Sequence, residues 1–411
     1  MKYIIESRLD TDWYKFIMGQ LVFDRYADIL VKYSFKNRTT GILLTKYIDE
    51  KELRDELNHI RELKFKKEEL NYLSSLKNEA GEKIFTNNYL KFFENLKLPA
   101  YELENLGNTY RLEFKGLWAE TIYWETPVLA VITELYGREA LEQMEITDKL
   151  ANRGIGQLKL AIKAANLAEY PNILFSDFGT RRRFSKQWQE IIVKTLMKIM
   201  PKQFIGTSNV ELAMKYNLQP IGTMAHEMFM AMSGIFQSRT NPIFESQKRI
   251  LKDWWEEYGT SSAIALTDTF GTDFFLKNFS KEEARKWKGL RQDSGDPFAF
   301  AEKAIVFYKE HGINPKEKII VFSDGLTAET IITLHQKFSG RVQTAFGWGT
   351  NLTNDLNVKP LSLVIKLVET DGCPVVKLSD NIAKAIGDPE EIERIKKLVN
   401  YNSAYNQACV Y

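Results

Sequence analysis

Strand-like and helix-like segments alternate along the chain from Asn172 onward, and this alternation limits the possible folds more than any other feature. Helical segments such as residues 188–200 and 298–309 lie between most of the strand-like segments. The strand pattern occurs in seven apolar segments: NILFSDFG, QFIGTS, QPIGTMAH, AIALTDTF, KGLRQDSGD, KIIVFSDG and VQTAFGWG. Strands that alternate with helices form βαβ units and a parallel sheet. About seven such units in a row predict an α/β fold with an incomplete βα barrel of about seven strands.

The two ends of the chain have a different pattern. Residues 110–118 alternate between apolar and polar side chains, which predicts a strand. Residues 362–368 and 374–378 flank Asp371-Gly372, a pair that favours a hairpin turn. We therefore expect both ends to build one α+β domain beside the barrel. The expected divisions are residues 1–125 for its N-terminal part, 126–357 for the barrel, and 358–411 for a C-terminal segment that packs on the N-terminal part.

Helices are predicted in both end regions. Residues 11–23 fit a helix with Thr11 or Asp12 at its N-cap. Residues 50–97 carry Lys, Glu and Leu at helical spacing, which is typical of solvated amphipathic helices. Pro127 suits the first turn of a long helix, and residues 389–398 fit another near the C-terminus.

Composition excludes several classes of protein. Hydrophobic residues make up 44% of the 411 residues, so the chain can bury a sizeable core. A net charge of +2 argues against a nucleic-acid binder that relies on a general basic field, but it allows a local basic pocket for a small phosphorylated ligand. The two cysteines, Cys373 and Cys409, are too few for a disulfide framework. With no signal-like h-region and no apolar run of spanning length, we expect a cytoplasmic protein without a membrane partner.

Polar residues at the ends of the predicted strands form the candidate site. In a βα barrel these positions line one face. They are occupied by one histidine, one serine, one arginine and four carboxylates: Asp177, Ser208, His226, Asp268, Arg291, Asp293 and Asp324. Buried carboxylates are costly unless they meet cations or donors, so a cation, a metal or a set of sugar hydroxyls is expected there. Helix capping explains Asp177 and Asp324 equally well, whereas Asp268 and Asp293 are expected to be functional.

Two glycine-containing stretches follow adjacent predicted strands. Residues 323–327 (SDGLT) run into a helix, and residues 346–351 (FGWGTN) follow the next strand. Backbone N–H groups near glycines and helix N-termini attract oxyanions. Either stretch alone is more often a turn, but the pair predicts a phosphate site. Phe178 at the mouth of the first strand can stack on a flat ring, and Arg181 beside it can reach inward.

These motifs together resemble the nicotinate phosphoribosyltransferase family. The motifs that carry the resemblance are TDWYK, FSDFGTRR, GTSNVELA, GTMAHE, LTDTFGTDFF, GLRQDSGDP, SDGL and FGWGTNL, from Asp12 to the hairpin after Asn354. The resemblance implies transfer of a 5-phosphoribosyl group from phosphoribosyl pyrophosphate (PRPP) to the ring nitrogen of nicotinate. The products are nicotinate mononucleotide and pyrophosphate, a step of NAD biosynthesis coupled to hydrolysis of ATP with Mg²⁺. It also implies a split α+β domain beside an incomplete barrel.

The resemblance assigns roles at the reacting centre. Asp293 would hold the ribose hydroxyls with Asp268 at the same centre, where carboxylates stabilise an oxocarbenium-like transition state. His226 would accept a phosphoryl group from ATP, because a neutral imidazole is a competent nucleophile. Arg291 would help to hold phosphate or ribose. Mg²⁺ would be held mainly by substrate oxygens and water. Three roles are considered for Asp324: binding Mg²⁺, binding the ribose, or capping the following helix.

The resemblance also assigns the substrate-binding residues. The 5-phosphate would be held by Gly325, Gly347, Gly349, Thr350 and Asn351. Nicotinate would lie between Phe178 and Tyr14, with Arg181 near its carboxylate. Tyr14, and Arg38 with it, would come from the neighbouring subunit of a homodimer.

One position bears on the choice of pyridine. The related nicotinamide enzyme has an aspartate where this chain has Ser208, and a serine hydroxyl can donate to a carboxylate, which favours nicotinate.

Three alternatives remain. The first is a nicotinamide or quinolinate enzyme of the same fold; a quinolinate enzyme needs more basic residues around the ring and no phosphorylated histidine. A binding protein without catalysis has no need of Asp268, Asp293 and His226. A barrel glycosidase has no need of the phosphate loops.

Overall fold

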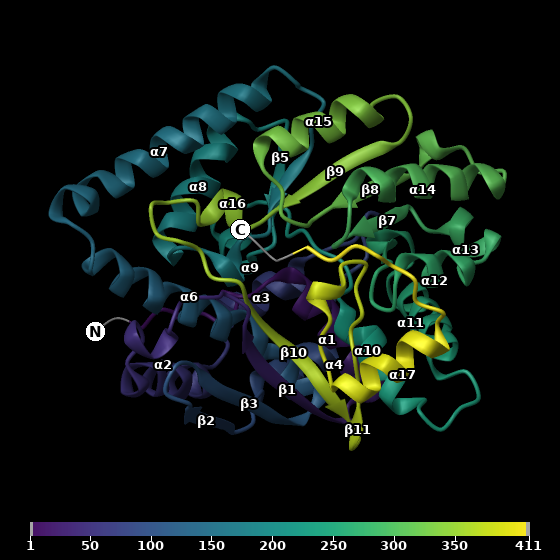
Figure 1. Cartoon of the computed structure of the whole chain (residues 1–411), viewed down its shortest axis with the longest axis horizontal. Helices are drawn as coiled ribbons and strands as arrows, with labels where there is room; N and C mark the ends of the chain where they lie inside the picture. The colour runs from purple at the N-terminus through teal and green to yellow at the C-terminus, as the bar shows by residue number, and fades with distance from the viewer. Residues whose placement is uncertain (1–2, 408–411) are drawn as a thin grey trace.

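The computed structural model describes residues 3–407, which form two β-sheets surrounded by helices (Figure 1). Cys409 lies outside the described residues. The strands are β1 Leu30–Asn37, β2 Tyr101–Asn105, β3 Tyr110–Leu117, β4 Phe175–Asp177, β5 Phe204–Thr207, β6 Ile264–Leu266, β7 Gly289–Gln292, β8 Ile319–Phe322, β9 Gln343–Trp348, β10 Leu363–Thr370 and β11 Cys373–Pro374.

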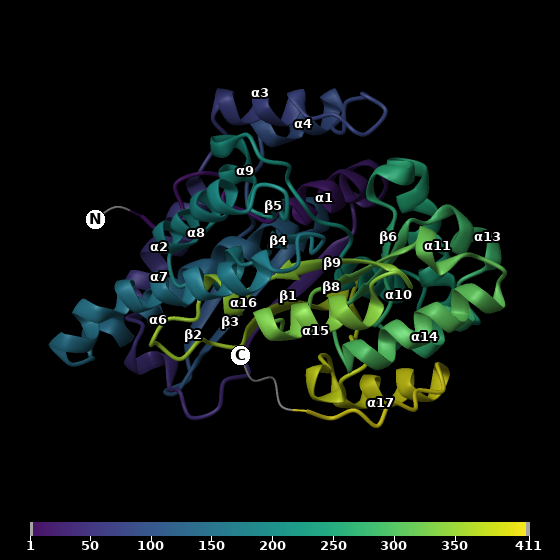
Figure 2. The same ribbon diagram turned by 90° about the horizontal axis from the view of Figure 1, so that it is seen from above.

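Helices connect and cover these strands. They are α1 Trp13–Tyr26, α2 Glu50–Glu62, α3 Lys67–Ser75, α4 Asn87–Glu94, α5 Trp118–Thr121, α6 Glu125–Glu142, α7 Ile146–Ala168, α8 Lys186–Ile199, α9 Val210–Tyr216, α10 His226–Ile235, α11 Pro242–Tyr258, α12 Thr272–Lys277, α13 Lys281–Lys286, α14 Pro297–Glu310, α15 Ala328–Phe338, α16 Thr350–Thr353 and α17 Pro389–Leu398. Figure 2 shows α3 and α4 on one side of the molecule and α17 on the opposite side.

The antiparallel sheet joins the two ends of the chain. Its order is β11-β10-β1-β3-β2, so β10 from the C-terminal part lies beside β1 from the N-terminal part (Figure 1). The predicted hairpin is confirmed: β10 pairs with β11, and Asp371 and Gly372 both have positive φ (47° and 79°), as the favoured two-residue turn requires. Both chain ends therefore build one sheet, as expected.

The parallel sheet carries the strand ends of interest. Its order is β5-β4-β9-β8-β7-β6, so each strand lies beside its neighbour in the chain and β9 returns to β4. This cyclic order is interrupted only between β5 and β6. The mixed arrangement of a parallel and an antiparallel sheet agrees with the predicted α/β class, but the parallel sheet has six hydrogen-bonded strands instead of about seven.

The predicted strand in QPIGTMAH does not form. Residues 218–225 make only an isolated bridge, between Thr207 and Pro220. Pro220 has no N–H group to donate to a neighbouring strand. The backbone of Gln219 also lies very close to Gly206: a Cβ atom on residue 206 would be 2.2 Å from the Gln219 carbonyl oxygen. The segment instead contacts both edge strands, because Ile221 N donates to Thr207 O (2.9 Å) and Thr223 Oγ1 donates to Ile264 O (2.7 Å). Residues 218–225 therefore lie between β5 and β6, and His226 follows directly after them.

The helices next to the site are packed into the hydrophobic core. In α1, Phe16, Ile17 and Leu21 are fully buried, and apolar residues lie on every side of the helix, which is typical of a helix enclosed by other elements. Helix α10 packs against α11 and β10 with Met228 and Met230 in the core. Within residues 3–407 the structure contains no helix both long and apolar enough to cross a bilayer.

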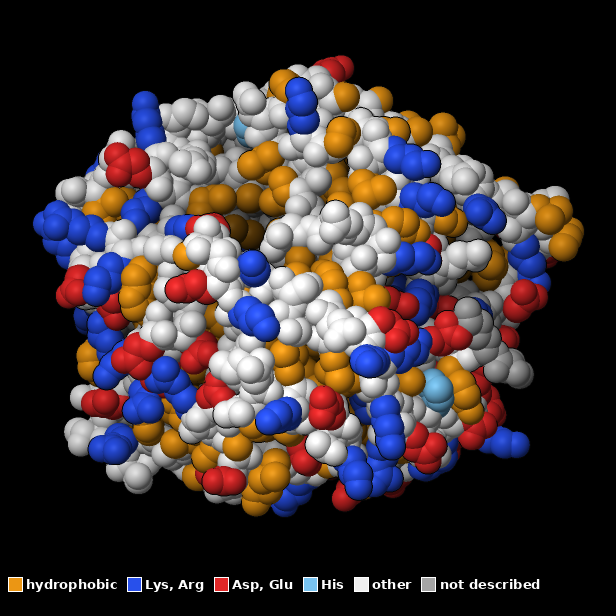
Figure 3. Space-filling view, turned by 180° about the vertical axis from the view of Figure 1, so that it is seen from behind, with side chains coloured by type: hydrophobic (Ala, Val, Ile, Leu, Met, Phe, Trp, Pro, Cys, Tyr) orange, Lys and Arg blue, Asp and Glu red, His pale blue; other side chains and the backbone are white. Residues whose placement is uncertain are grey.

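The charges on the outer surface are mixed. Figure 3 shows acidic and basic side chains interspersed over the back of the molecule. This pattern agrees with the near-zero net charge, so any strong field must be local.

Candidate active site

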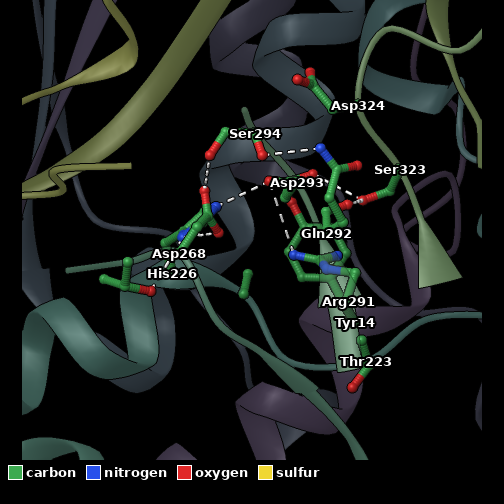
Figure 4. Close-up of polar contacts among 12 residues, drawn as sticks. Tyr14, Thr223, His226, Asp268, Arg291, Gln292, Asp293, Ser294, Ser323 and Asp324 are labelled. Carbon is green, nitrogen blue, oxygen red and sulfur yellow. Dashed lines mark hydrogen bonds and ion pairs between the residues drawn. The ribbon is translucent and has the colours of Figure 1, made fainter. Parts of the chain in front are cut away.

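His226 lies at the centre of the candidate site. It is the first residue of α10 and its side chain is almost completely buried. Its Nε2 lies 2.9 Å from Asp293 Oδ2, directly after β7, and its Nδ1 lies 3.1 Å from Thr269 Oγ1 and 3.7 Å from Asp268 Oδ1 (Figure 4). The segments that follow β6 and β7 therefore meet at one imidazole ring. Of the four strand-end carboxylates expected around this histidine, two contact it.

The imidazole of His226 is neutral at physiological pH. Burial lowers its pKa to about 4, and the nearby Lys377 ammonium acts in the same direction. A carboxylate can only accept a hydrogen bond, so the neutral ring carries its proton on Nε2, facing Asp293, and Nδ1 accepts from the Thr269 hydroxyl. A neutral ring retains a lone pair and can act as a nucleophile.

Asp293 stays ionised although it is close to the protein interior. Burial opposes its charge, but the Arg291 guanidinium and His226 outweigh that effect and hold the pKa of the carboxyl well below its usual range. Arg291 Nη2 lies 4.0 Å from Asp293 Oδ2, and Ser323 Oγ donates to Asp293 Oδ1 (2.9 Å). Asp293 stands between His226 and Ser323 (Figure 4), so its negative charge faces the same space as the histidine.

Asp268 lies on the Nδ1 side of the His226 ring. Its Oδ2 accepts from Ser379 Oγ (3.2 Å) and lies 3.8 Å from Lys377 Nζ. Its Oδ1 is buried and has no hydrogen-bond partner among the described residues. Burial opposes the charge of Asp268, but the Lys377 ammonium and the hydrogen bond from Ser294 Oγ help to keep the pKa of its carboxyl below the usual value. An ionised carboxylate with an unused oxygen therefore lies beside His226 Nδ1.

The two glycine-containing loops lie side by side at the ends of β8 and β9, which pair in parallel. Gly325 has φ +58°, a backbone conformation that side chains other than glycine rarely adopt. Asn351 Nδ2 donates to Leu326 O (3.0 Å) and ties the two loops together. Asp324 forms an ion pair with Lys384 from the C-terminal region. The loop after β8 then enters α15, whose N-terminus favours an anion.

A cavity of about 100 Å³ opens between these loops and the antiparallel sheet. Most of the predicted site residues line it: Arg38, Phe178, Arg181, His226, Arg291, Asp293, Asp324, Gly325, Gly349, Thr350 and Asn351. Among the described residues its wall contains seven cations and two carboxylates, so it favours an anionic ligand. A larger cavity of about 390 Å³, bounded by Phe270 and Tyr401, does not touch His226 and has no comparable excess of cations.

Tyr14 lies beside Arg181 of its own chain but does not itself line the cavity. Arg181 Cζ lies 5.8 Å from the centroid of the Tyr14 ring, and the Tyr14 hydroxyl donates to Glu125 Oε2 (3.1 Å). Arg38 also lines the cavity within the same chain, and its Nη2 donates to Lys384 O (2.8 Å). Both residues therefore meet site residues of their own chain in this structure, whereas the resemblance implies a neighbouring subunit. The start of α1 is held beside β5 because Trp13 N donates to Ser208 O (2.6 Å).

Two other assignments need correction. Ser208 Oγ donates to Asp12 Oδ1 (2.7 Å) and does not line the cavity, so its hydroxyl is committed to the protein. Gly347 does not line the cavity either. A Cβ at Gly347 would lie 2.5 Å from the Phe178 ring, so this glycine makes room for the ring rather than for a phosphate.

Asp177 has a structural role. It is fully buried and accepts from Gly179 N (2.8 Å), Gln189 Nε2 (2.8 Å) and Thr207 Oγ1 (2.7 Å). Burial raises its pKa to about 6 despite these donors. The carboxylate therefore fixes the turn that follows β4 and positions Phe178.

Three lysines of the site were not predicted. Lys366, Lys377 and Lys384 line the cavity, and they belong to the C-terminal segment that was expected only to pack on the N-terminal part. The sequence does contain one signal, since Lys366 interrupts the apolar strand LVIKLV. A lysine in a buried strand is rare unless it has an ionic partner.

This fold and this site indicate a class of protein: an enzyme whose strand-end loops border a cation-lined cavity beside a His–Asp pair. Two family models match the chain, the nicotinate phosphoribosyltransferase family over residues 173–403 and the nicotinate phosphoribosyltransferase N-terminal domain over residues 9–133.

Solved structures agree with these matches. A nicotinate phosphoribosyltransferase from Porphyromonas gingivalis is 31% identical, with a TM-score of 0.86 over 97% of this chain and 100% of the other. One from Vibrio cholerae is 32% identical, with a TM-score of 0.86 over 97% of this chain and 94% of the other. The chain belongs to the nicotinate phosphoribosyltransferase family.

Proposed function

We propose that this chain catalyses transfer of the 5-phosphoribosyl group of PRPP to nicotinate, which yields nicotinate mononucleotide and pyrophosphate in NAD biosynthesis. The observation that carries the proposal is the ionised Asp293 beside neutral His226 at the wall of a cavity with seven cations. The cations suit the phosphate and pyrophosphate groups of PRPP. The Phe178 ring and the Arg181 guanidinium at one end of the cavity suit a flat carboxylated ring.

Asp293 is proposed to act on the ribose. When pyrophosphate leaves, the anomeric carbon gains positive charge, and a fixed carboxylate nearby stabilises it. Asp293 is suited to this role because its pKa lies well below the usual range. Ser323 and Arg291 hold its side chain in place, so that little reorganisation is needed during the reaction.

His226 is proposed to couple ATP hydrolysis to this transfer. In the coupling step a bond forms between Nε2 and the γ-phosphorus of ATP, the bond to the bridging oxygen breaks, and ADP leaves. Attack from Nε2 requires the ring proton on Nδ1. The unused Oδ1 of Asp268 lies 3.7 Å from Nδ1 and would accept a hydrogen bond from it after moving closer. Ribose hydroxyls that bind Asp293 would release Nε2 from its present hydrogen bond. Hydrolysis of the labile phosphoramidate completes the cycle.

Mg²⁺ is proposed to accompany PRPP and ATP. Within residues 3–407 no group of three His, Cys, Asp or Glu side chains forms a metal site. Asp293 and Asp324 do line the cavity, and one or two carboxylates with substrate phosphates are a common Mg²⁺ environment, so these residues would hold it. When bound, Mg²⁺ would neutralise part of the negative charge of the pyrophosphate.

A panel of pyridines tests the proposed reaction. The full chain is incubated with PRPP, Mg²⁺ and nicotinate, nicotinamide or quinolinate, with and without ATP, and mononucleotide is measured by chromatography. We expect product from nicotinate, formed faster with ATP. Absence of product from nicotinate would contradict the proposal, and product from quinolinate alone would favour the rival enzyme.

The proposed homodimer and cytoplasmic location rest on the resemblance. Exposed apolar side chains on α7, such as Leu150 and Leu158 (78% and 62% exposed), offer a surface for a second copy. Each copy would carry a complete site, because Arg38 lines the cavity of its own chain and Tyr14 lies beside Arg181 of that chain.

Mixing two inactive variants tests whether sites are shared. A Tyr14→Ala/Arg38→Ala variant and an Asp293→Ala variant are each expected to be inactive, and their mixture should stay inactive because every chain lacks part of its own site. Transferase rates are measured before and after subunit exchange. Recovery of about a quarter of the parent activity, the fraction expected for random heterodimers of a shared site, would show that the residues act across subunits.

A further inference from the structure

Lys366 brings a second cation to the ring-binding end of the cavity. It lies on β10, and its side chain is only 14% exposed. Val364 and Lys366, two residues apart on one face of β10, both line the cavity. Lys366 Nζ donates to Glu125 Oε1 (3.0 Å), and Arg181 Nη1 lies 3.4 Å from the same oxygen. Two cations therefore share one carboxylate oxygen at the cavity wall.

Little negative charge around Glu125 is available to balance the two cations, Arg181 and Lys366. Glu125 Oε2 lies 2.7 Å from Lys15 Nζ and accepts from the Tyr14 hydroxyl. Fully buried Lys15 also pairs with Glu227, so it balances that second carboxylate. Glu125 is then the carboxylate that contacts both Arg181 and Lys366.

Three further charged groups lie near this cluster, and none of them contacts both Arg181 and Lys366. Asp12 and Asp293 are further carboxylates near Arg181, but Asp12 does not line the cavity and Asp293 faces Arg291 and His226. Lys377 adds positive charge near Lys366. Burial lowers the pKa of Lys366 to about 8 even though Glu125 opposes the change. A further anion beside Lys366 and Arg181 would relieve this imbalance.

We propose that Lys366 determines substrate specificity, because its ammonium group binds the carboxylate of a pyridine carboxylic acid together with Arg181. This inference rests on the proposed function and assigns to Lys366 the role first expected of Ser208. A ring stacked on Phe178 would direct its carboxylate toward the two cations. A neutral amide in the same place leaves both cations without their anion, and sites built for a charged partner reject analogues that lack it.

Substitution of Lys366 tests the proposal by steady-state kinetics on the full chain. Lys366→Gln is expected to raise KM for nicotinate on the order of 10²-fold and to leave KM for PRPP within about twofold. Activity with nicotinamide should not fall, so the preference for nicotinate shrinks. Lys366→Arg keeps the charge and should retain most of the nicotinate affinity. An unchanged nicotinate KM in Lys366→Gln, or an equal rise in the PRPP KM, would overturn the proposal.

A matched cation on the other side of the cavity provides the control. Lys384 pairs with Asp324 in the loop after β8, so Lys384→Gln should raise KM for PRPP and leave KM for nicotinate nearly unchanged. If the parent chain forms no mononucleotide from nicotinate, the proposed function fails. If the parent is active and the two lysine variants behave alike, only the assignment of Lys366 fails.

The pH dependence of the parent protein gives a second test, which does not depend on whether the Lys366→Gln variant folds. Lys366 loses its charge as pH rises through about 8, so KM for nicotinate should rise above that pH. Arginine keeps its proton throughout this range, and Lys366→Arg should therefore lack the rise. The groups facing Lys366 are Glu125, Arg181 and Lys377, and the same rise in Lys366→Arg would contradict the proposal by assigning the titration to one of them.

Discussion

Replacement of Asp293 by alanine is expected to lower kcat for mononucleotide formation on the order of 10³-fold. The substitution removes the ionised carboxylate that lies 2.9 Å from His226 Nε2 at the cavity wall. Without that charge the positive centre that forms as pyrophosphate leaves is no longer stabilised. The PRPP phosphates still meet Arg291 and Lys384, so KM for PRPP should change much less than kcat. Steady-state rates with PRPP and nicotinate measure both constants.

Two further variants separate charge from shape. Asp293→Asn keeps the size of the side chain and an oxygen for the Ser323 hydroxyl, but it lacks the charge, so its kcat should fall nearly as far. Asp296→Asn is the matched control, because Asp296 caps α14 through Phe298 N and Ala299 N and lies outside the cavity around His226. Its kcat should stay within about twofold of the parent value. A parent-like rate in Asp293→Asn would show that the negative charge is not needed.

Replacement of His226 by alanine should abolish stimulation by ATP and leave slow transfer without ATP. The ring is the proposed phosphoryl acceptor, whereas Asp293 keeps its contacts with Ser323 and Arg291 when the ring is removed. His226→Gln fills more of the space without a nucleophilic nitrogen and should behave in the same way. Rates with and without ATP give the result. Loss of ATP-independent transfer with normal PRPP binding would assign the histidine to glycosidic bond formation itself.

The pH range of ATP stimulation reports on the same residue. Because burial lowers the pKa of His226 to about 4, the neutral nucleophile persists well below the usual histidine pKa of about 6.5. Stimulation by ATP should therefore persist at pH 6 and disappear only as the pH falls toward 4. Loss of stimulation centred near pH 6.5 would contradict the proposed environment of the ring.

Convergence of the site could be predicted because a cyclic order of parallel strands brings all strand ends to one edge. For this reason Asp268, Asp293 and His226 could be grouped although they lie far apart in the chain, and the loops at Gly325 and Gly349 follow by the same rule. The position of His226 was predicted correctly even though the strand before it does not form.

Contacts that depend on side-chain direction or on long-range packing could not be predicted. Tyr14 has the same local sequence whichever subunit it contacts, so only the tertiary structure shows that it lies beside Arg181 of its own chain. Ser208 stands at a strand end as expected, but its hydroxyl turns to Asp12 rather than to the cavity. Lys366 reaches the cavity because β10 pairs with β1, a partnership between segments more than 300 residues apart.

Detection of a phosphoryl group on His226 tests the coupling of ATP to transfer most directly. The full chain is incubated with ATP and Mg²⁺, digested under alkaline conditions that preserve phosphohistidine, and analysed by mass spectrometry. The modification is expected on His226 of the parent chain, absent from His226→Gln, and discharged when PRPP and nicotinate are added. ATP-stimulated formation of nicotinate mononucleotide without any phosphoryl group on His226 would contradict the proposed role of this histidine.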